Sequence, residues 1–192
     1  MNTKPLKLQN IADFFSLYFA TIASTIEKVD QSQLEKAAEL MRQSHAKGGK
    51  TIFVGNGGSA AMASHLSVDL TKAAGIRAIN FNEADLLTCF ANDYGYENWV
   101  ARALEAYADS DDLVVLISSS GNSKNIINGV AQARKMDLPV ITLSGFKSEN
   151  TLRTLGDINF WCDSEKYNVV EMTHHVWLLA MVDFIIYKKQ SQ

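Results

Sequence analysis

A glycine-rich turn between a predicted strand and a predicted helix is the first stretch of this chain whose residues could do chemistry. Residues 51–54 are β-branched or aromatic, residues 55–59 read GNGGS, and an alanine-rich segment that favours a helix follows. Such an order leaves free backbone N–H groups at the amino end of the helix, where they can bind an anion. Glycine suits the turn because it accepts unusual dihedral angles and lets a ligand approach the backbone closely.

His65 and Asp69 lie on the helix that is predicted to follow this turn. They are four residues apart, so they share one face of the helix. Three interpretations fit the pair: two metal ligands, a base with the carboxylate that orients it, or an ordinary surface pair.

A serine-rich loop is the second segment that predicts binding. Residues 118–123 read SSSGNS and lie between a continuous apolar run and a predicted helix. Four hydroxyls and the backbone N–H groups of such a loop suit a phosphate monoester. Serines can also simply cap a helix and fill a turn, but four of them around Gly-Asn exceed what a cap needs. Both loops should lie at the carboxyl ends of strands, where open α/β sheets bind ligands.

A third group of candidate residues opens the last predicted helix, where Glu171, His174 and His175 occur together. Glu171 and His175 share a helix face, as His65 and Asp69 do. Two such pairs from two helices could build a four-ligand site of the kind that zinc accepts. Each pair taken alone is more often structural.

Nucleotide binding is a weaker interpretation of the glycine turn. Residues 55–60 satisfy the pattern GxGxxA, but Asn80 stands where a dinucleotide site expects an acidic residue, and Glu83 comes late. The chain contains no GxxxxGK[ST] motif, which excludes phosphoryl transfer by a P-loop.

The predicted elements alternate between strand and helix. The strands are expected at residues 51–54, 76–81, 113–117, 138–143 and 158–162. The helices are expected at residues 6–29, 31–47, 59–72, 82–90, 97–107, 125–136, 150–155 and 169–187, with a turn at Asn92-Asp93-Tyr94-Gly95. This alternation predicts an α/β fold with a parallel sheet covered on both faces. Part of the wide aromatic face of the first helix is expected to be an oligomer contact.

The composition is typical of one ordinary globular domain. The chain has 192 residues, 47% hydrophobic and 20% charged, with a formal net charge of −3, which argues against a general nucleic-acid or anionic-membrane binder. Cys89 and Cys162 are too few and too far apart for a zinc ribbon or a disulfide framework, so a reducing cytoplasm is expected. The N-terminus shows no signal peptide, and the longest apolar run, residues 176–187, is judged too short and interrupted to span a bilayer.

These motifs together resemble the sugar isomerase (SIS) domain family, and within it the phosphoheptose isomerases. The resemblance rests on GNGGSA, the His-x-x-x-acid pair, Asn-Asp-Tyr-Gly, SSSGNS and the Glu/His cluster of the last helix. It implies a flavodoxin-like αβα sandwich formed by one SIS domain over residues 1–192, with helices over 1–48 in oligomer contacts and the α/β core over 49–192. It also implies a homotetramer that isomerises sedoheptulose 7-phosphate for the heptose of surface lipopolysaccharide.

The resemblance also implies roles for individual residues. The phosphate would be bound by Ser118, Ser119, Ser120 and Ser123, the sugar would lie near Asn56 and Ser59, and Asp93 would meet its hydroxyls. Gly57 and Asn122 complete the expected binding residues. His65 matches a zinc ligand, and Asp69 matches a family glutamate that is both ligand and acid/base.

The sequence departs from the family at the other two zinc ligands, where it has Val170 and Leu178. One expectation is a site rebuilt with Glu171 and His175, in which His65, Asp69 and His175 bind the zinc; the alternatives are an enzyme without zinc or a protein that is no isomerase. We expect an aldose–ketose isomerase that works through an enediol, with Asp69 or Glu171 moving the proton and His65 or His175 as its partner. The rival expectation is a non-catalytic phosphosugar-binding regulator or adaptor, and turnover separates the two.

Overall fold

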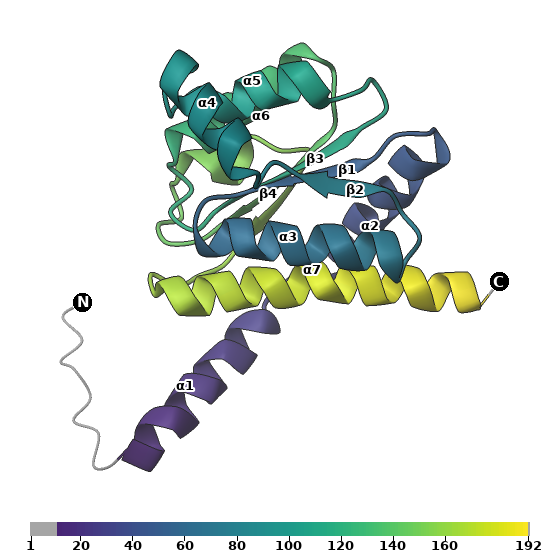
Figure 1. Ribbon diagram of the computed structural model, residues 1–192. Coiled ribbons are helices and arrows are strands. Elements are labelled where there is room, and N and C mark those ends of the chain that lie inside the picture. Colours follow the sequence, from purple (N-terminus) through teal and green to yellow (C-terminus); the bar gives the residue numbers. More distant parts are fainter. Residues whose placement is uncertain (1–10, 192) are drawn as a thin grey trace.

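A parallel sheet of five strands forms the centre of the molecule in this computed structural model, which describes residues 11–191 (Figure 1). The strands are β1 (Thr51–Val54), β2 (Ala78–Asn80), β3 (Leu113–Ser118), β4 (Val140–Ser144) and β5 (Ile158–Trp161). They lie in the order β2-β1-β3-β4-β5. From β1 the chain adds β2 on one side and then β3, β4 and β5 on the other, so the topological switch point lies between β1 and β3. Parallel sheets of this kind bind ligands at the carboxyl ends of the strands beside such a switch point. The predicted α/β class is confirmed.

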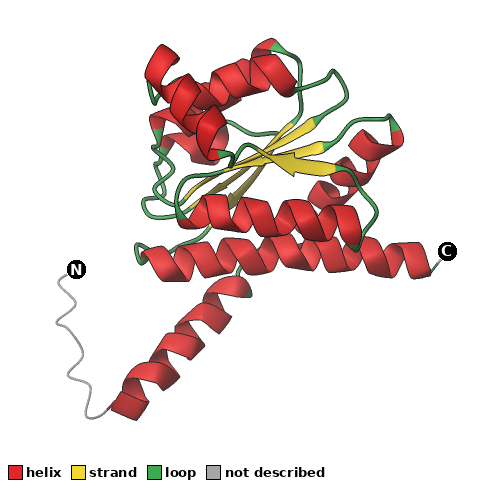
Figure 2. Ribbon diagram, in the orientation of Figure 1, coloured by secondary structure: helices red, strands yellow, loops and turns green. Residues whose placement is uncertain are grey.

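Helices cover both faces of the sheet, as the continuous apolar strands require. One layer consists of α2 (Gln31–Ala46), α3 (Gly58–Lys72) and α7 (Tyr167–Gln190); the other consists of α4 (Ala84–Tyr94), α5 (Trp99–Tyr107) and α6 (Lys124–Lys135) (Figure 2). Each layer has its own apolar core, and all residues of β1, β3 and β4 are buried between them. The αβα sandwich is therefore fixed mainly by β-branched and leucine side chains in the strands.

The predicted end of α4 was wrong. Helix α4 continues to Tyr94, so Asn92 and Asp93 lie in a helix and the reversal falls at Gly95, whose φ is +82°. The rings of Phe90 and Tyr94 pack edge to face at 5.7 Å, and such a contact between residues four apart extends the helix past the polar pair. The segment predicted as a helix over 150–155 is a short 3₁₀ helix, η1 (Thr151–Thr154).

Helix α7 is longer than the sequence predicted. It runs unbroken for 24 residues, and within residues 11–191 it is the one helix long and apolar enough to cross a membrane. The apolar run is therefore not too short, contrary to expectation. Half of its most apolar stretch is buried inside the protein, against α1, α2 and α3, as in the core helix of a globular fold.

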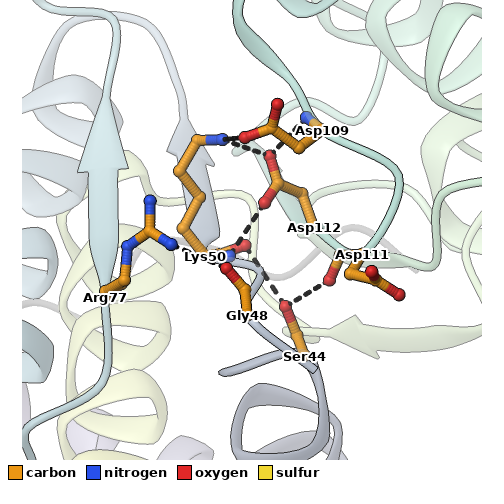
Figure 3. Close-up of polar contacts among 7 residues, drawn as sticks. All are labelled: Ser44, Gly48, Lys50, Arg77, Asp109, Asp111 and Asp112. Atoms are coloured by element: carbon orange, nitrogen blue, oxygen red, sulfur yellow. Dashed lines mark hydrogen bonds and ion pairs between the residues drawn. The ribbon is translucent and has the colours of Figure 1, made fainter. Parts of the chain in front are cut away.

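The amino ends of β1 and β3 are joined by a polar cluster (Figure 3). Nζ of Lys50 lies 2.6 Å from Oδ2 of Asp112 and 2.7 Å from Oδ2 of Asp109, and the backbone N–H of Lys50 donates to Oδ1 of Asp112 at 2.8 Å. Asp112 is fully buried. Burial opposes the charge on Lys50, but the hydrogen bonds from its ammonium to the two carboxylates outweigh burial and raise its pKa.

Helix α1 (Ile11–Ile26) projects from the body of the molecule (Figure 1). Its far end carries exposed apolar side chains, including Phe14, Phe15 and Phe19. At the near end, the indole N–H of Trp177 donates to the carbonyl of Ile26 at 2.9 Å. The part of the predicted helix that precedes Ile11 lies outside the described residues.

Candidate functional site

The glycine turn and the serine loop meet around a cavity of about 150 Å³ at the carboxyl ends of β1 and β3. The turn follows β1, the loop follows β3, and the start of α7 closes the cavity. Its lining residues are Asn56, Ser59, Ile117, Ser118, Ser119, Ser120, Ser123, Tyr167 and Glu171. A larger groove of about 770 Å³ lies between α2, β5 and α7, but it contains none of the predicted site residues.

The glycine turn presents the amino end of α3 to this cavity. Gly57, the residue before the helix, has φ +54°, and no side chain caps the helix there. Asn56 is held by a reciprocal pair of amide hydrogen bonds with Asn125, at 2.9 and 3.0 Å, and its oxygen also accepts from the hydroxyl of Tyr96 at 3.1 Å. These contacts join the turn to α6 and to the segment between α4 and α5.

The serine loop presents a second helix terminus to the same cavity. Ser123 precedes α6, but its side chain does not cap that helix; instead its oxygen accepts a hydrogen bond from the Ser118 hydroxyl at 3.0 Å. The hydroxyl of Ser119 is buried and has no partner within residues 11–191. A buried hydroxyl without a partner is costly, and the uncapped amino ends of α3 and α6 both favour negative charge. The arrangement suits a phosphate group better than a purely structural cap.

Glu171 brings a carboxylate to the same cavity. It lies so close to Gly58 that a Cβ at that position would collide with the Glu171 carboxylate. This places the carboxylate beside the amino end of α3, where the helix dipole stabilises negative charge. The cavity thus combines donors for an anion on the serine side with a potential base on the α7 side.

One turn further along α7, His175 forms a hydrogen-bonded chain with α3. Nε2 of His175 lies 2.9 Å from Nδ1 of His65, and Nε2 of His65 lies 3.1 Å from Oδ2 of Asp69. The two imidazole rings meet edge to face, with centroids 4.9 Å apart. Partial burial lowers the pKa of His175, and the neighbouring His65 lowers it further, while Asp69 acts in the opposite direction.

Comparisons with known proteins place the chain in a family. Residues 15–145 match the model of the SIS domain. The chain belongs to the SIS domain family. It is 36% identical to a phosphoheptose isomerase of Aliarcobacter butzleri over 83% of this chain and 87% of that protein, and 36% identical to one of Cytophaga hutchinsonii over 72% and 75%. The structure of the phosphoheptose isomerase GmhA from Neisseria gonorrhoeae superimposes with a TM-score of 0.83 at 30% identity, covering 92% of this chain and 99% of that one.

The predicted site residues of this SIS domain fall into three groups. Seven line the cavity: Asn56, Ser59, Ser118, Ser119, Ser120, Ser123 and Glu171. His65, Asp69 and His175 form the hydrogen-bonded chain beside it, while Gly57, Asp93 and Asn122 are not among the lining residues. The Asn122 amide accepts from the N–H of Thr151 and donates to the carbonyl of Ser120, which stabilises the loop. Asp93 is exposed on α4.

Three residues near the cavity were missed: Tyr96, Asn125 and Tyr167. Asn125 lies in the first turn of α6, two residues after the serine loop, so its position beside an expected binding loop was a usable signal. Tyr96 and Tyr167 reach the site from a turn and from the start of α7, and nothing in their local sequence indicates this.

The residues present do not fit the zinc site that the resemblance implied. Val170 and Leu178 are fully buried in the apolar core and offer no ligand atoms. The two ring nitrogens of His65 contact Asp69 and His175, so the three side chains satisfy one another by hydrogen bonds. Across residues 11–191 no group of three or more His, Cys, Asp or Glu side chains is arranged to hold a metal ion. The expectation of zinc bound by His65, Asp69 and His175 is not supported.

His174 is separate from the site. Its side chain is fully buried, and Nε2 lies 2.9 Å from the carbonyl oxygen of Ser144 on β4. Burial lowers its pKa to about 4, only partly offset by that hydrogen bond. His174 is therefore a neutral core residue.

Proposed function

We propose that the protein is a phosphosugar isomerase that interconverts an aldose and a ketose phosphate through an enediol, with sedoheptulose 7-phosphate as the substrate by analogy with the named relatives. The observation that carries the proposal is the shared cavity. Two uncapped helix termini, the serine cluster and the Glu171 carboxylate line one space.

The phosphate is bound on the serine side of the cavity. The Ser118 hydroxyl oxygen lies 3.5 Å from that of Ser120 and 3.0 Å from that of Ser123, so three hydroxyls gather there. Ser119 supplies a fourth hydroxyl, which lacks a partner in the described chain. The cavity of about 150 Å³ holds only the phosphate end, so the sugar carbons extend along α7 past Glu171.

Glu171 acts as the base that moves the proton between the two carbons. Its carboxylate lies against Gly58 at the start of α3 and lines the same cavity as the serines, so it can face the carbons of a sugar whose phosphate those serines hold. A carboxylate near C1 and C2 can remove the proton from one carbon and return it to the other, which typically contributes a rate factor of about 10²–10⁴.

Self-association and a cytoplasmic location complete the proposal. The exposed aromatic side chains of α1 and the apolar groove of about 580 Å³ between the end of α1, α2 and α7 support a homo-oligomer, for which we propose four copies. The single SIS domain spans residues 1–192, with the helical pair over 1–48 in subunit contacts.

Proton NMR in deuterated water tests the activity. Incubation with sedoheptulose 7-phosphate should introduce deuterium at the carbon beside the carbonyl, because the enediol exchanges that proton with solvent. Ser120→Ala should weaken binding about tenfold, the loss of one hydrogen bond to a charged group. Ser110→Ala, on an exposed turn at the other end of the sheet, is the matched control. Binding without any exchange would instead favour the non-catalytic phosphosugar-binding regulator.

A further inference from the structure

The Asp69–His65–His175 chain has a definite direction of hydrogen bonding. Asp69 is a carboxylate and can only accept, so Nε2 of His65 must carry the proton that spans their 3.1 Å separation. In the neutral tautomer of His65 that carries this proton, Nδ1 is bare and accepts the hydrogen bond from His175 across 2.9 Å. Nε2 of His175 is therefore protonated, and its Nδ1 keeps a free lone pair.

That nitrogen is available to a ligand. Nδ1 of His175 has no hydrogen-bond partner among residues 11–191, and the side chain is half-buried. Glu171 lies one turn earlier on α7, so the two side chains leave the helix on the same face, roughly 6 Å apart at Cβ. A sugar phosphate that extends from the serine loop past Glu171 reaches His175 next.

We infer that His175, oriented by His65 and Asp69, shuttles the proton between the two oxygens of the substrate and takes the place of a metal ion in this enzyme. The inference rests on the proposed isomerase function. His175 is a second catalytic residue, which touches the substrate beside Glu171, whereas His65 and Asp69 are positioning residues that fix its tautomer.

The proton balance of the reaction closes without a further reactant. Glu171 removes a proton from C1 of the ketose, which leaves an enediolate with its negative charge on O2. Nδ1 of His175 takes the proton from O1 and gives it to O2, so the charge moves to O1. Glu171 then returns its proton to C2 while the C1–O1 double bond forms, and both side chains end as they began.

The hydrogen-bonded chain also explains how charge is stabilised in that step. His175 is an imidazolium only while it carries the shuttled proton, next to an enediolate. Its Nε2–H points at His65, which in turn donates to the Asp69 carboxylate, so the transient positive charge faces a fixed negative one. A metal ion would supply positive charge at the same stage.

Nitrogen NMR of histidine-labelled protein tests the tautomers directly. The chain has four histidines, which substitution to Gln assigns one by one. At a pH above 7.5, His175 should show a protonated Nε2 and a bare Nδ1. Asp69→Asn should reverse both rings, since the new amide can donate to His65, and Nδ1 of His175 should become protonated. An unchanged His175 tautomer in Asp69→Asn would overturn the assignment.

Kinetics supply the second test. Protein freed of metal by a chelator should keep its full activity, and added zinc should not raise it. Asp69→Asn and His175→Ala should lower kcat about 10²-fold or more with KM changed less than threefold, and imidazole should partly restore His175→Ala. Asp183→Asn, an exposed carboxylate on the same helix, should leave kcat unchanged.

The possible failures can be told apart. Activity that is lost on chelation and regained with zinc overturns the metal-free shuttle while the isomerase function stands. Conversion of the ketose phosphate to the aldose phosphate at an undiminished rate in His175→Ala also overturns the shuttle alone. Wild-type protein that binds phosphosugars and catalyses no exchange overturns the proposed function itself.

Discussion

The fully buried His174 links the stability of the protein to pH. Its pKa is lowered to about 4 in the folded protein, against the usual 6.5 for an unfolded chain. A depressed pKa means that the unfolded state binds the proton more tightly, so the stabilisation is complete above pH 6.5 and declines as the pH falls towards 4. A shift of this size corresponds to about 3 kcal/mol of unfolding free energy.

Urea denaturation at pH 7.5, 6 and 5 checks this prediction. The wild-type unfolding free energy should fall across the series, and His174→Gln should lose most of that pH dependence because it removes the titrating ring. Parallel pH profiles for the two proteins would show that another group controls acid stability.

Asn125 is a second single residue with a testable role, because its side chain orients that of Asn56. Asn125→Ala removes both of its amide hydrogen bonds to Asn56 and leaves only Tyr96 to hold that side chain. We expect a rise of about tenfold in KM for the phosphosugar with a smaller change in kcat, equivalent to about one net hydrogen bond. Steady-state kinetics check it, with the exposed Lys135→Ala on the same helix as the control.

At the scale of elements, the Lys50 cluster holds β1 against β3. Lys50→Met leaves the fully buried Asp112 carboxylate without its cation, which typically costs about 3–5 kcal/mol of unfolding free energy. Arg42→Ala, which breaks an exposed pair with Glu39 on α2, should cost less than about 1 kcal/mol. Equal losses in denaturant titrations of the two variants would contradict the assigned role.

The sequence predicted those elements whose signal is local. A continuous apolar run predicted β3, short segments rich in β-branched and aromatic residues predicted the other strands, and all five are present. The end of α4 was missed because the packing of Phe90 on Tyr94 outweighs the turn preference of Asn92 and Asp93. Helix and turn propensities describe single residues, whereas the end of α4 depends on a contact between two side chains, so propensity alone could not predict it.

The candidate site shows the same division. The glycine turn and serine loop are local motifs, and the structure brings both to one cavity. The roles of Tyr96 and Tyr167 depend on how distant segments pack, which no window of sequence records. The two rings of His65 and His175 meet only because α3 lies beside α7, 110 residues later in the chain.

At the scale of the whole molecule, α1 predicts self-association. Its side chains Ile11, Phe14, Phe15, Leu17 and Phe19 are 48–77% exposed, a larger apolar surface than a monomer normally leaves in water. Phe15→Asp with Phe19→Asp should convert the proposed oligomer to monomers, measured by light scattering after gel filtration. The exposed Lys135→Glu should leave the mass unchanged. A wild-type protein that is already monomeric at micromolar concentration would refute the prediction.

The Lys50–Asp112 cluster lies at the amino ends of the strands, and the cavity lies at the carboxyl ends of the same two strands. Mutations that alter the loops at the carboxyl ends of the strands therefore leave the Lys50–Asp112 ion pair at their amino ends intact. Such a sheet can lose a set of metal ligands, or acquire a histidine beside the cavity, without crossing a threshold below which it no longer folds. Descendants of one ancestral chain can in this way diversify their chemistry while inheriting the same scaffold.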